Sequence, residues 1–182
     1  MRLTLHSSHP MTASAMTPPT AAPAIPLKEF DAEMASTRRL LERIPSDKAT
    51  WKPHEKSFAL GHLAQLVAGM PGWITLTLRE PELDLSKQRG YSFEKTETLL
   101  AVFDENVASA RQALIDVTGP ALNADWSLKM GDKVLMTTPR GEVVRQHLSH
   151  LAHHRGQLTV YARLVDVPVP SIYGPTADER WF

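Results

Sequence analysis

The sequence predicts an all-α fold, a four-helix bundle with one long crossover connection. Four stretches place apolar residues three or four positions apart, which is the period of a helix with one buried face. Pro or Gly residues stand close to most ends of these stretches, where they limit helices. The 182 residues suit one domain with a sizeable core.

The first helix is expected over residues 27–44, between Pro26 and Pro45. Proline is tolerated at the start of a helix, but it disrupts a helix interior and so ends the helix. The second helix is expected over residues 58–78 on the strength of its apolar face. Pro71 lies inside this second stretch and predicts a kink or a break there.

The third helix is expected over residues 92–118, where the Gly-Pro pair at 119–120 should stop it. Residues 126–136 alternate loosely around Gly131 and predict a short β-hairpin before the last helix. The last helix, over residues 139–165, has the strongest helical pattern. The four tryptophans are expected in the core or in an interface: Trp51, Trp73, Trp126 and Trp181.

Residues 1–26 differ in composition from the rest and are expected to form a disordered N-terminal tail before a domain of residues 27–182. They show no apolar core of signal-peptide length. No stretch of the sequence is long and apolar enough to span a bilayer. We therefore expect a cytoplasmic protein that does not bind membranes.

Charge and cysteine content exclude several classes of function. The chain has 20 basic and 20 acidic residues, so it lacks the basic excess of a nucleic-acid-binding protein. It has no cysteine, which excludes disulfides, a thiolate nucleophile and zinc–thiolate sites. Imidazole and carboxylate groups remain as the side-chain metal ligands on offer.

Four of the eight histidines fall within residues 147–154, inside the expected last helix. Residues four positions apart share one face of a helix, so His150 and His154 can direct their imidazoles to one point. Two imidazoles at this spacing form half of a transition-metal site. The competing interpretation is that both are ordinary surface histidines.

A third ligand should come from a facing helix, because metal sites in bundles are built between helices. His62 is the only histidine in the first three expected helices. A lone histidine on a helix is more often a hydrogen-bonded core residue than a ligand. Three histidines would leave one coordination position open, which is typical of catalytic sites, and a metal there could activate a water or a thiol.

The roles of the neighbouring residues stay open. His153 competes with His154 as the partner of His150, and His147 is either a further ligand, a supporting group or a polar surface residue. Gln157 could support a ligand histidine or be merely polar. Glycine in a helix interior usually marks a close helix approach, which is what we expect at Gly156.

No general base can be named from the sequence, and no HExxH motif is present. Asp178 and Glu179 near the C-terminus either fold back towards the histidines or form ion pairs with Arg155 or Arg163. The second alternative, a structural role, is the simpler one. Arg155 is likewise expected to pair with a carboxylate rather than with a substrate.

The run His150-Leu-Ala-His-His-Arg-Gly-Gln-Leu158, its continuation to Leu164, and the segment 167–179 together resemble the last-helix signature of the DinB-like family, also called the DinB/YfiT-like metalloenzymes. The triplet Gly61-His62-Leu63 is similar to the segment of the family's second helix that carries a histidine. The resemblance covers roughly residues 27–180.

The resemblance implies a four-helix bundle in which His62, His150 and His154 bind a divalent metal, with nickel or zinc typical, and a homodimer. It further implies a metal-dependent enzyme, a hydrolase or a thiol-dependent S-transferase, that acts on a small molecule, which could be a low-molecular-weight thiol. The alternatives are a non-catalytic metal-binding or stress-response dimeric protein, and a dimeric scaffold whose site is degenerate.

Overall fold

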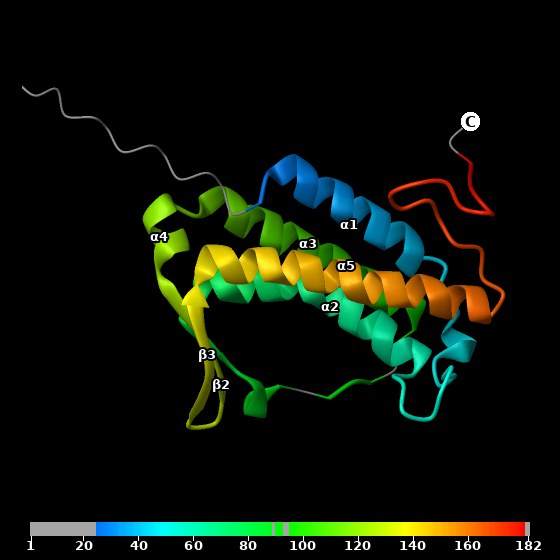
Figure 1. Cartoon of the computed structure of the whole chain (residues 1–182), viewed down its shortest axis with the longest axis horizontal. Coiled ribbons are helices and arrows are strands. Elements are labelled where there is room, and N and C mark those ends of the chain that lie inside the picture. Colours follow the sequence, from blue (N-terminus) through cyan, green and yellow to red (C-terminus); the bar gives the residue numbers. More distant parts are fainter. Residues whose placement is uncertain (1–24, 89, 93–94, 181–182) are drawn as a thin grey trace, which may run out of the picture.

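The structure is a computed structural model that describes residues 25–88, 90–92 and 95–180. The described part is mainly helical and carries a small three-stranded sheet (Figure 1). Its α-helices are α1 (Leu27–Leu41), α2 (Leu60–Arg79), α3 (Thr96–Asp116), α4 (Gly119–Asn123) and α5 (Arg140–Leu164). Single turns of 3₁₀ helix occur at η1 (Ser46–Lys48) and η2 (Leu85–Lys87). The expected tail falls almost wholly outside the described residues, and Ile25 is already buried.

The expected all-α class was too narrow, because three strands form a sheet in the order β1-β2-β3. The predicted hairpin is confirmed: β2 (Asp125–Met130) pairs antiparallel with β3 (Lys133–Pro139), and Gly131 takes the positive φ of 59° that its turn requires. Strand β1 (Glu82–Asp84) was missed. Its three residues are too short to show a period, and only the parallel pairing with β2 defines it.

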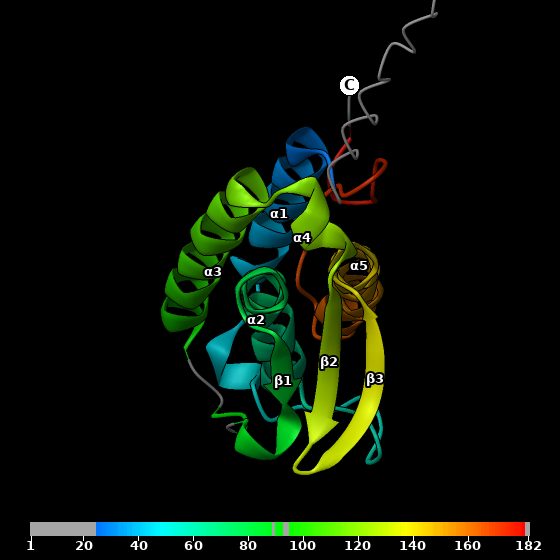
Figure 2. The same ribbon diagram turned by 90° about the vertical axis from the view of Figure 1, so that its left-hand side faces the viewer.

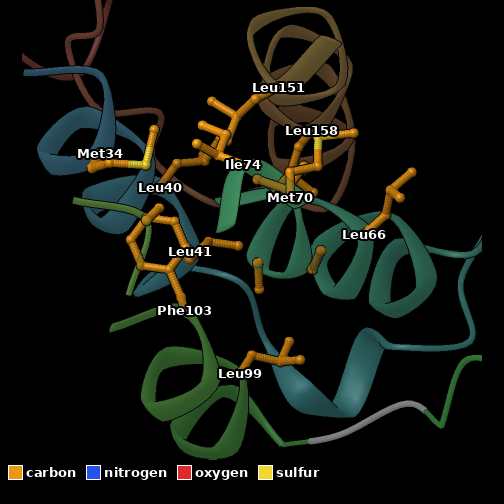
Figure 3. Packing of buried hydrophobic residues seen from close by; sticks show 14 of the residues in the cluster. Met34, Leu40, Leu41, Leu66, Met70, Ile74, Leu99, Phe103, Leu151 and Leu158 are labelled. Carbon is orange, nitrogen blue, oxygen red and sulfur yellow. The ribbon is translucent and has the colours of Figure 1, made fainter. Parts of the chain in front are cut away.

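Helix α2 occupies the centre of the helical layer. It packs against α3 on one side and α5 on the other, while α1 packs on α3 (Figure 2). Buried residues occur almost all around α2, as expected for a helix surrounded by others. Figure 3 shows apolar side chains of α1, α2, α3 and α5 meeting in one cluster.

Helix α2 starts two residues later than expected and continues through Pro71 without a break. The backbone N–H groups of Leu60 and Gly61 donate to the carbonyl oxygens of Trp51 and Ala49, at 2.8 and 2.9 Å. The preceding loop therefore satisfies donors that a helix start leaves free. The Gly-Pro pair at 119–120 opens α4 instead of only ending α3.

The C-terminal segment folds back over α1 and α5, and its carboxylates form ion pairs. Asp178 pairs with Arg163, as expected, whereas Glu179 pairs with Arg39 of α1 and with Arg43 just after α1. Arg155 is 1% exposed and pairs with Glu33 at 2.6 Å, so it is held by a carboxylate. These contacts give the segment a structural role.

Two further expectations have clear outcomes. No close helix approach occurs at Gly156, where an added Cβ would meet nothing within 4 Å, so that expectation was wrong. Trp126 is buried, and Trp51 and Trp73 pack against the core, as expected; Trp181 lies outside the described residues. No helix within the described ranges is long and apolar enough to cross a membrane.

Candidate metal centre

His150 and His154 lie one turn apart on α5 and face each other. Their Nε2 atoms are 2.9 Å apart, and their ring centroids are 4.7 Å apart. The four-residue spacing on a helix accounts for this approach without any long-range contact. The structure therefore brings His150 together with His154, one of the two partners that the spacing allows.

Gln157 fixes the orientation of His154. Its Oε1 lies 2.8 Å from His154 Nδ1, while its Nε2 lies 3.0 Å from Nε2 of His153. An amide oxygen can only accept, so Nδ1 of His154 carries the proton and Nε2 keeps its lone pair. This is the arrangement that supports metal-binding histidines in proteins. His153 is thereby engaged by Gln157, and His154 is the partner of His150.

His62 lies on α2 and is partly buried between aromatic side chains. Its ring centroid is 4.3 Å from that of Phe58 and 3.6 Å from that of Tyr91. The Phe58 ring in turn lies 6.4 Å from the ring of His154. The Phe58 ring thus lies near His62 of α2 and near His154 of α5. Among the described residues, no ring contact or hydrogen bond joins His62 itself to His150 or His154. Within the part of the chain that the structure describes, no three His, Cys, Asp or Glu side chains are grouped to hold a metal ion.

Tyr91 is held over His62 by the chain segment that follows it. The side chain of Gln65, one turn after His62, accepts from the backbone N–H of Ser92 at 3.0 Å and donates to its hydroxyl at 3.1 Å. Nothing in the local sequence around Tyr91 signals this contact. It arises because Gln65 and His62 share a face of α2.

His147 is partly buried and contacts Thr77 of α2, so it is not the polar surface residue that was one of the alternatives. Its Nε2 lies 2.9 Å from the hydroxyl oxygen of Thr77, which is fully buried. The rings of Trp73 and Trp126 lie against it, with centroids 5.8 and 6.5 Å away. Burial, with the charge of His150 as a smaller cause, lowers the pKa of His147 to about 4.

Desolvation is the main cause that lowers the pKa of two of the candidate ligands. It lowers the pKa of His62, with the charge of Lys52 as the second cause. It lowers the pKa of His150, with His154 and His153 contributing further. Neutral imidazole is the form that binds metals, so these shifts favour ligation at neutral pH.

Trp73 of α2 contacts two histidines of α5, His147 and His150. Its ring centroid lies 5.8 Å from that of His150. Helices α2 and α5 pack side by side and run in opposite directions (Figure 1). Trp73, late in α2, therefore meets the earlier histidines of α5, while His62, early in α2, lies on the side of His154.

Comparison with known proteins gives consistent matches over most of the chain. A model of the DinB family matches residues 24–180. An uncharacterized protein of Bacillus subtilis, YrdA, is 26% identical over 159 residues, which span 85% of this chain and 89% of that protein.

Two solved structures share the fold. The DinB-like protein YjoA of Bacillus subtilis has a TM-score of 0.64 at 18% identity, over 80% of this chain and 96% of that one. A DinB-like protein of Bacillus cereus has a TM-score of 0.62 at 20% identity, over 81% of this chain and 95% of that one.

Proposed function

The chain belongs to the DinB family, and we propose that it binds a divalent metal ion and acts as a metal-dependent enzyme on a small molecule. The proposed ligands are His62, His150 and His154. The observation that carries the proposal is the 2.9 Å approach of Nε2 of His150 to Nε2 of His154, with Gln157 bonded to the far nitrogen of His154.

The side chains of His150 and His154 on α5 provide ligand atoms that suit such an ion. Both side chains offer imidazole nitrogens, which suit zinc and nickel, and Gln157 leaves the lone pair of His154 directed to His150. His62 is the proposed third ligand because the Phe58 ring lies near both its ring and that of His154. Its side chain would have to turn away from Phe58 and Tyr91 to join the pair.

The proposed reaction is hydrolysis or thiol transfer. A metal held by three histidines has an open position, and it would lower the pKa of a water or of a low-molecular-weight thiol. The chain's own groups position this chemistry. Gln157 orients His154, and Trp73 packs beside His150 and limits its movement. A homodimer is part of the proposal.

Metal analysis of protein purified without an affinity tag tests the ligand assignment. We expect about one zinc or nickel ion per chain, since the three ligands form one site. His150→Ala and His154→Ala should each lose most of the metal, and His62→Ala should weaken its retention. His54→Ala is the matched control, because His54 is an exposed loop histidine whose side chain accepts a hydrogen bond from the nearby backbone N–H of Lys56.

Full metal content in both His150→Ala and His154→Ala would overturn the metal site. Activity is tested separately, by a screen of the metal-loaded protein with low-molecular-weight thiols and electrophiles. Turnover that is lost in His150→Ala supports the enzyme. Stoichiometric metal without any turnover would instead favour a non-catalytic metal-binding or stress-response protein.

A further inference from the structure

Aromatic rings lie beside each of the three candidate metal ligands. Tyr91 lies on His62, Phe58 lies between His62 and His154, and Trp73 lies beside His150. We call Phe58, Trp73 and Tyr91 the aromatic flank. The three rings come from the loop before α2, from α2 itself and from the connection before α3. Their gathering at one site is therefore a product of the fold.

Two rings of the aromatic flank are open to solvent. Phe58 and Tyr91 are each 43% exposed although both rings contact His62. Exposed apolar surface beside a polar cluster is a usual feature of ligand sites. Two hydrogen bonds between Ser92 and Gln65 hold the backbone next to Tyr91 in place.

The two helices that carry the candidate ligands are poor in acidic groups. Helix α2 contains no Asp or Glu, and α5 contains only Glu142, in its first turn. Lys52 follows Trp51, whose carbonyl oxygen accepts from the N–H of Leu60 at 2.8 Å, so Lys52 lies beside the start of α2. The same loop carries Glu55 and Lys56, so two basic residues stand there against one acidic residue. The side of the site that carries Phe58 therefore favours a negatively charged ligand.

We propose that the substrate of this site is a small anion that carries an aromatic or other flat ring. The ring would lie on Phe58 and Tyr91, and the negative charge would lie towards Lys52. Aromatic side chains favour offset or edge contacts with such rings. This inference rests on the proposed function, since it names the class of substrate for the same metal site.

The first test compares three probes: 2-naphthoate, 2-naphthamide and acetate. They separate the ring from the charge, and binding to the full chain is measured by titration calorimetry or by NMR. We expect 2-naphthoate to bind at least about tenfold more tightly than acetate, because ring contacts add to burial of apolar area. We expect it to bind more tightly than 2-naphthamide at low salt, because the exposed charge of Lys52 acts only on the anion.

Variants then locate the binding. Phe58→Ala and Tyr91→Ala should each lower the affinity for 2-naphthoate by about threefold to tenfold. Tyr91→Phe keeps the ring and should bind 2-naphthoate as tightly as the wild type. Lys52→Met should lower the affinity for 2-naphthoate by about twofold to fivefold and leave the affinity for 2-naphthamide unchanged. Ile115→Ala on α3 and Lys28→Met on α1 are the controls, because both residues are exposed and belong to other elements.

All measurements are made on zinc-loaded and on metal-stripped protein, with zinc content recorded for each sample. Equal affinity for 2-naphthoate and acetate, or unchanged binding in Phe58→Ala and Tyr91→Ala, would overturn the ring site. Equal affinity for 2-naphthoate and 2-naphthamide would overturn the preference for anions. Failure of the proposed function has a different signature: zinc would not bind, while the metal-stripped protein would still prefer 2-naphthoate.

Discussion

Gln157 accepts a hydrogen bond from Nδ1 of His154, with 2.8 Å between the two heavy atoms. The contact sets the tautomer of His154 and leaves its other nitrogen facing His150. The amide group of Gln157 also reaches His153, so one side chain holds two imidazoles of α5. The orientation of the histidine pair therefore depends on a residue that would not itself bind the metal.

Replacing Gln157 with Leu should weaken metal binding by about tenfold or more, because loss of the supporting bond frees the ring of His154. Competition with a chelator measures this affinity. Gln157→Glu keeps an accepting oxygen and should retain binding. Gln146→Leu, an exposed position on the same helix, is the control. Unchanged affinity in Gln157→Leu would show that the bond does not support the site.

Glu33→Gln should lower the free energy of unfolding by about 3 kcal/mol, because it leaves the charge of buried Arg155 without its carboxylate. Arg155 would keep its bonds to the Thr37 hydroxyl and to the Glu33 carbonyl, at 3.0 and 3.1 Å. Urea denaturation measures the change. Asp31→Asn removes the exposed ion pair with Arg111 and should cost less than about 1 kcal/mol. Similar losses in both variants would contradict this account.

Gly156→Ala should raise the free energy of unfolding by about 0.5–1 kcal/mol, because alanine restricts the unfolded chain and favours the helix. The added methyl group meets no atom within 4 Å, so nothing offsets the gain. Gly72→Ala is the matched contrast in α2, where the new Cβ would lie 2.7 Å from Oδ1 of Asn106. It should be less stable than Gly156→Ala by about 1 kcal/mol. Equal changes in the free energy of unfolding in Gly156→Ala and Gly72→Ala would contradict the close contact between Gly72 and Asn106.

Acid should weaken the attachment of the C-terminal segment. Bonds from Arg163 and from the Val169 amide hold the pKa of Asp178 below its usual value. Bonds from the Ser171 amide and from Arg43 do the same for the pKa of Glu179. A carboxylate with a lowered pKa in the folded state stabilises it above the pKa of the unfolded chain, about 4, and this contribution is lost as the pH falls further.

The double variant Asp178→Asn/Glu179→Gln should therefore be less stable than the wild type at pH 6, and the difference should shrink towards pH 3. Urea denaturation across this range measures it. Asp132→Asn, at the exposed hairpin turn, should show no such convergence. A difference that stays constant with pH would mean that the charges of the two carboxylates do not attach the segment.

The helices and the histidine pair could be predicted from the sequence because both depend on local spacing. A period of three to four residues marks a helix with a buried face wherever it lies in the fold. The four-residue separation of His150 and His154 made them a candidate pair, although the spacing left His153 as a competing partner. The turn of the hairpin was predictable for a similar reason, since Gly131 supplies a positive φ that other residues adopt rarely.

The tertiary structure decided what depends on contacts between distant segments. The pairing of β1 with β2, the start of α2 against the loop at Ala49 and Trp51, and the burial of His147 beside Thr77 have no local signature. The same holds for the position of Tyr91 over His62. Helical spacing therefore limited which histidines of α5 could face each other, while the packing of α2 on α5 decided which aromatic rings surround them. Spacing is a property of one backbone, whereas the distance between two helices is set by every side chain packed between them.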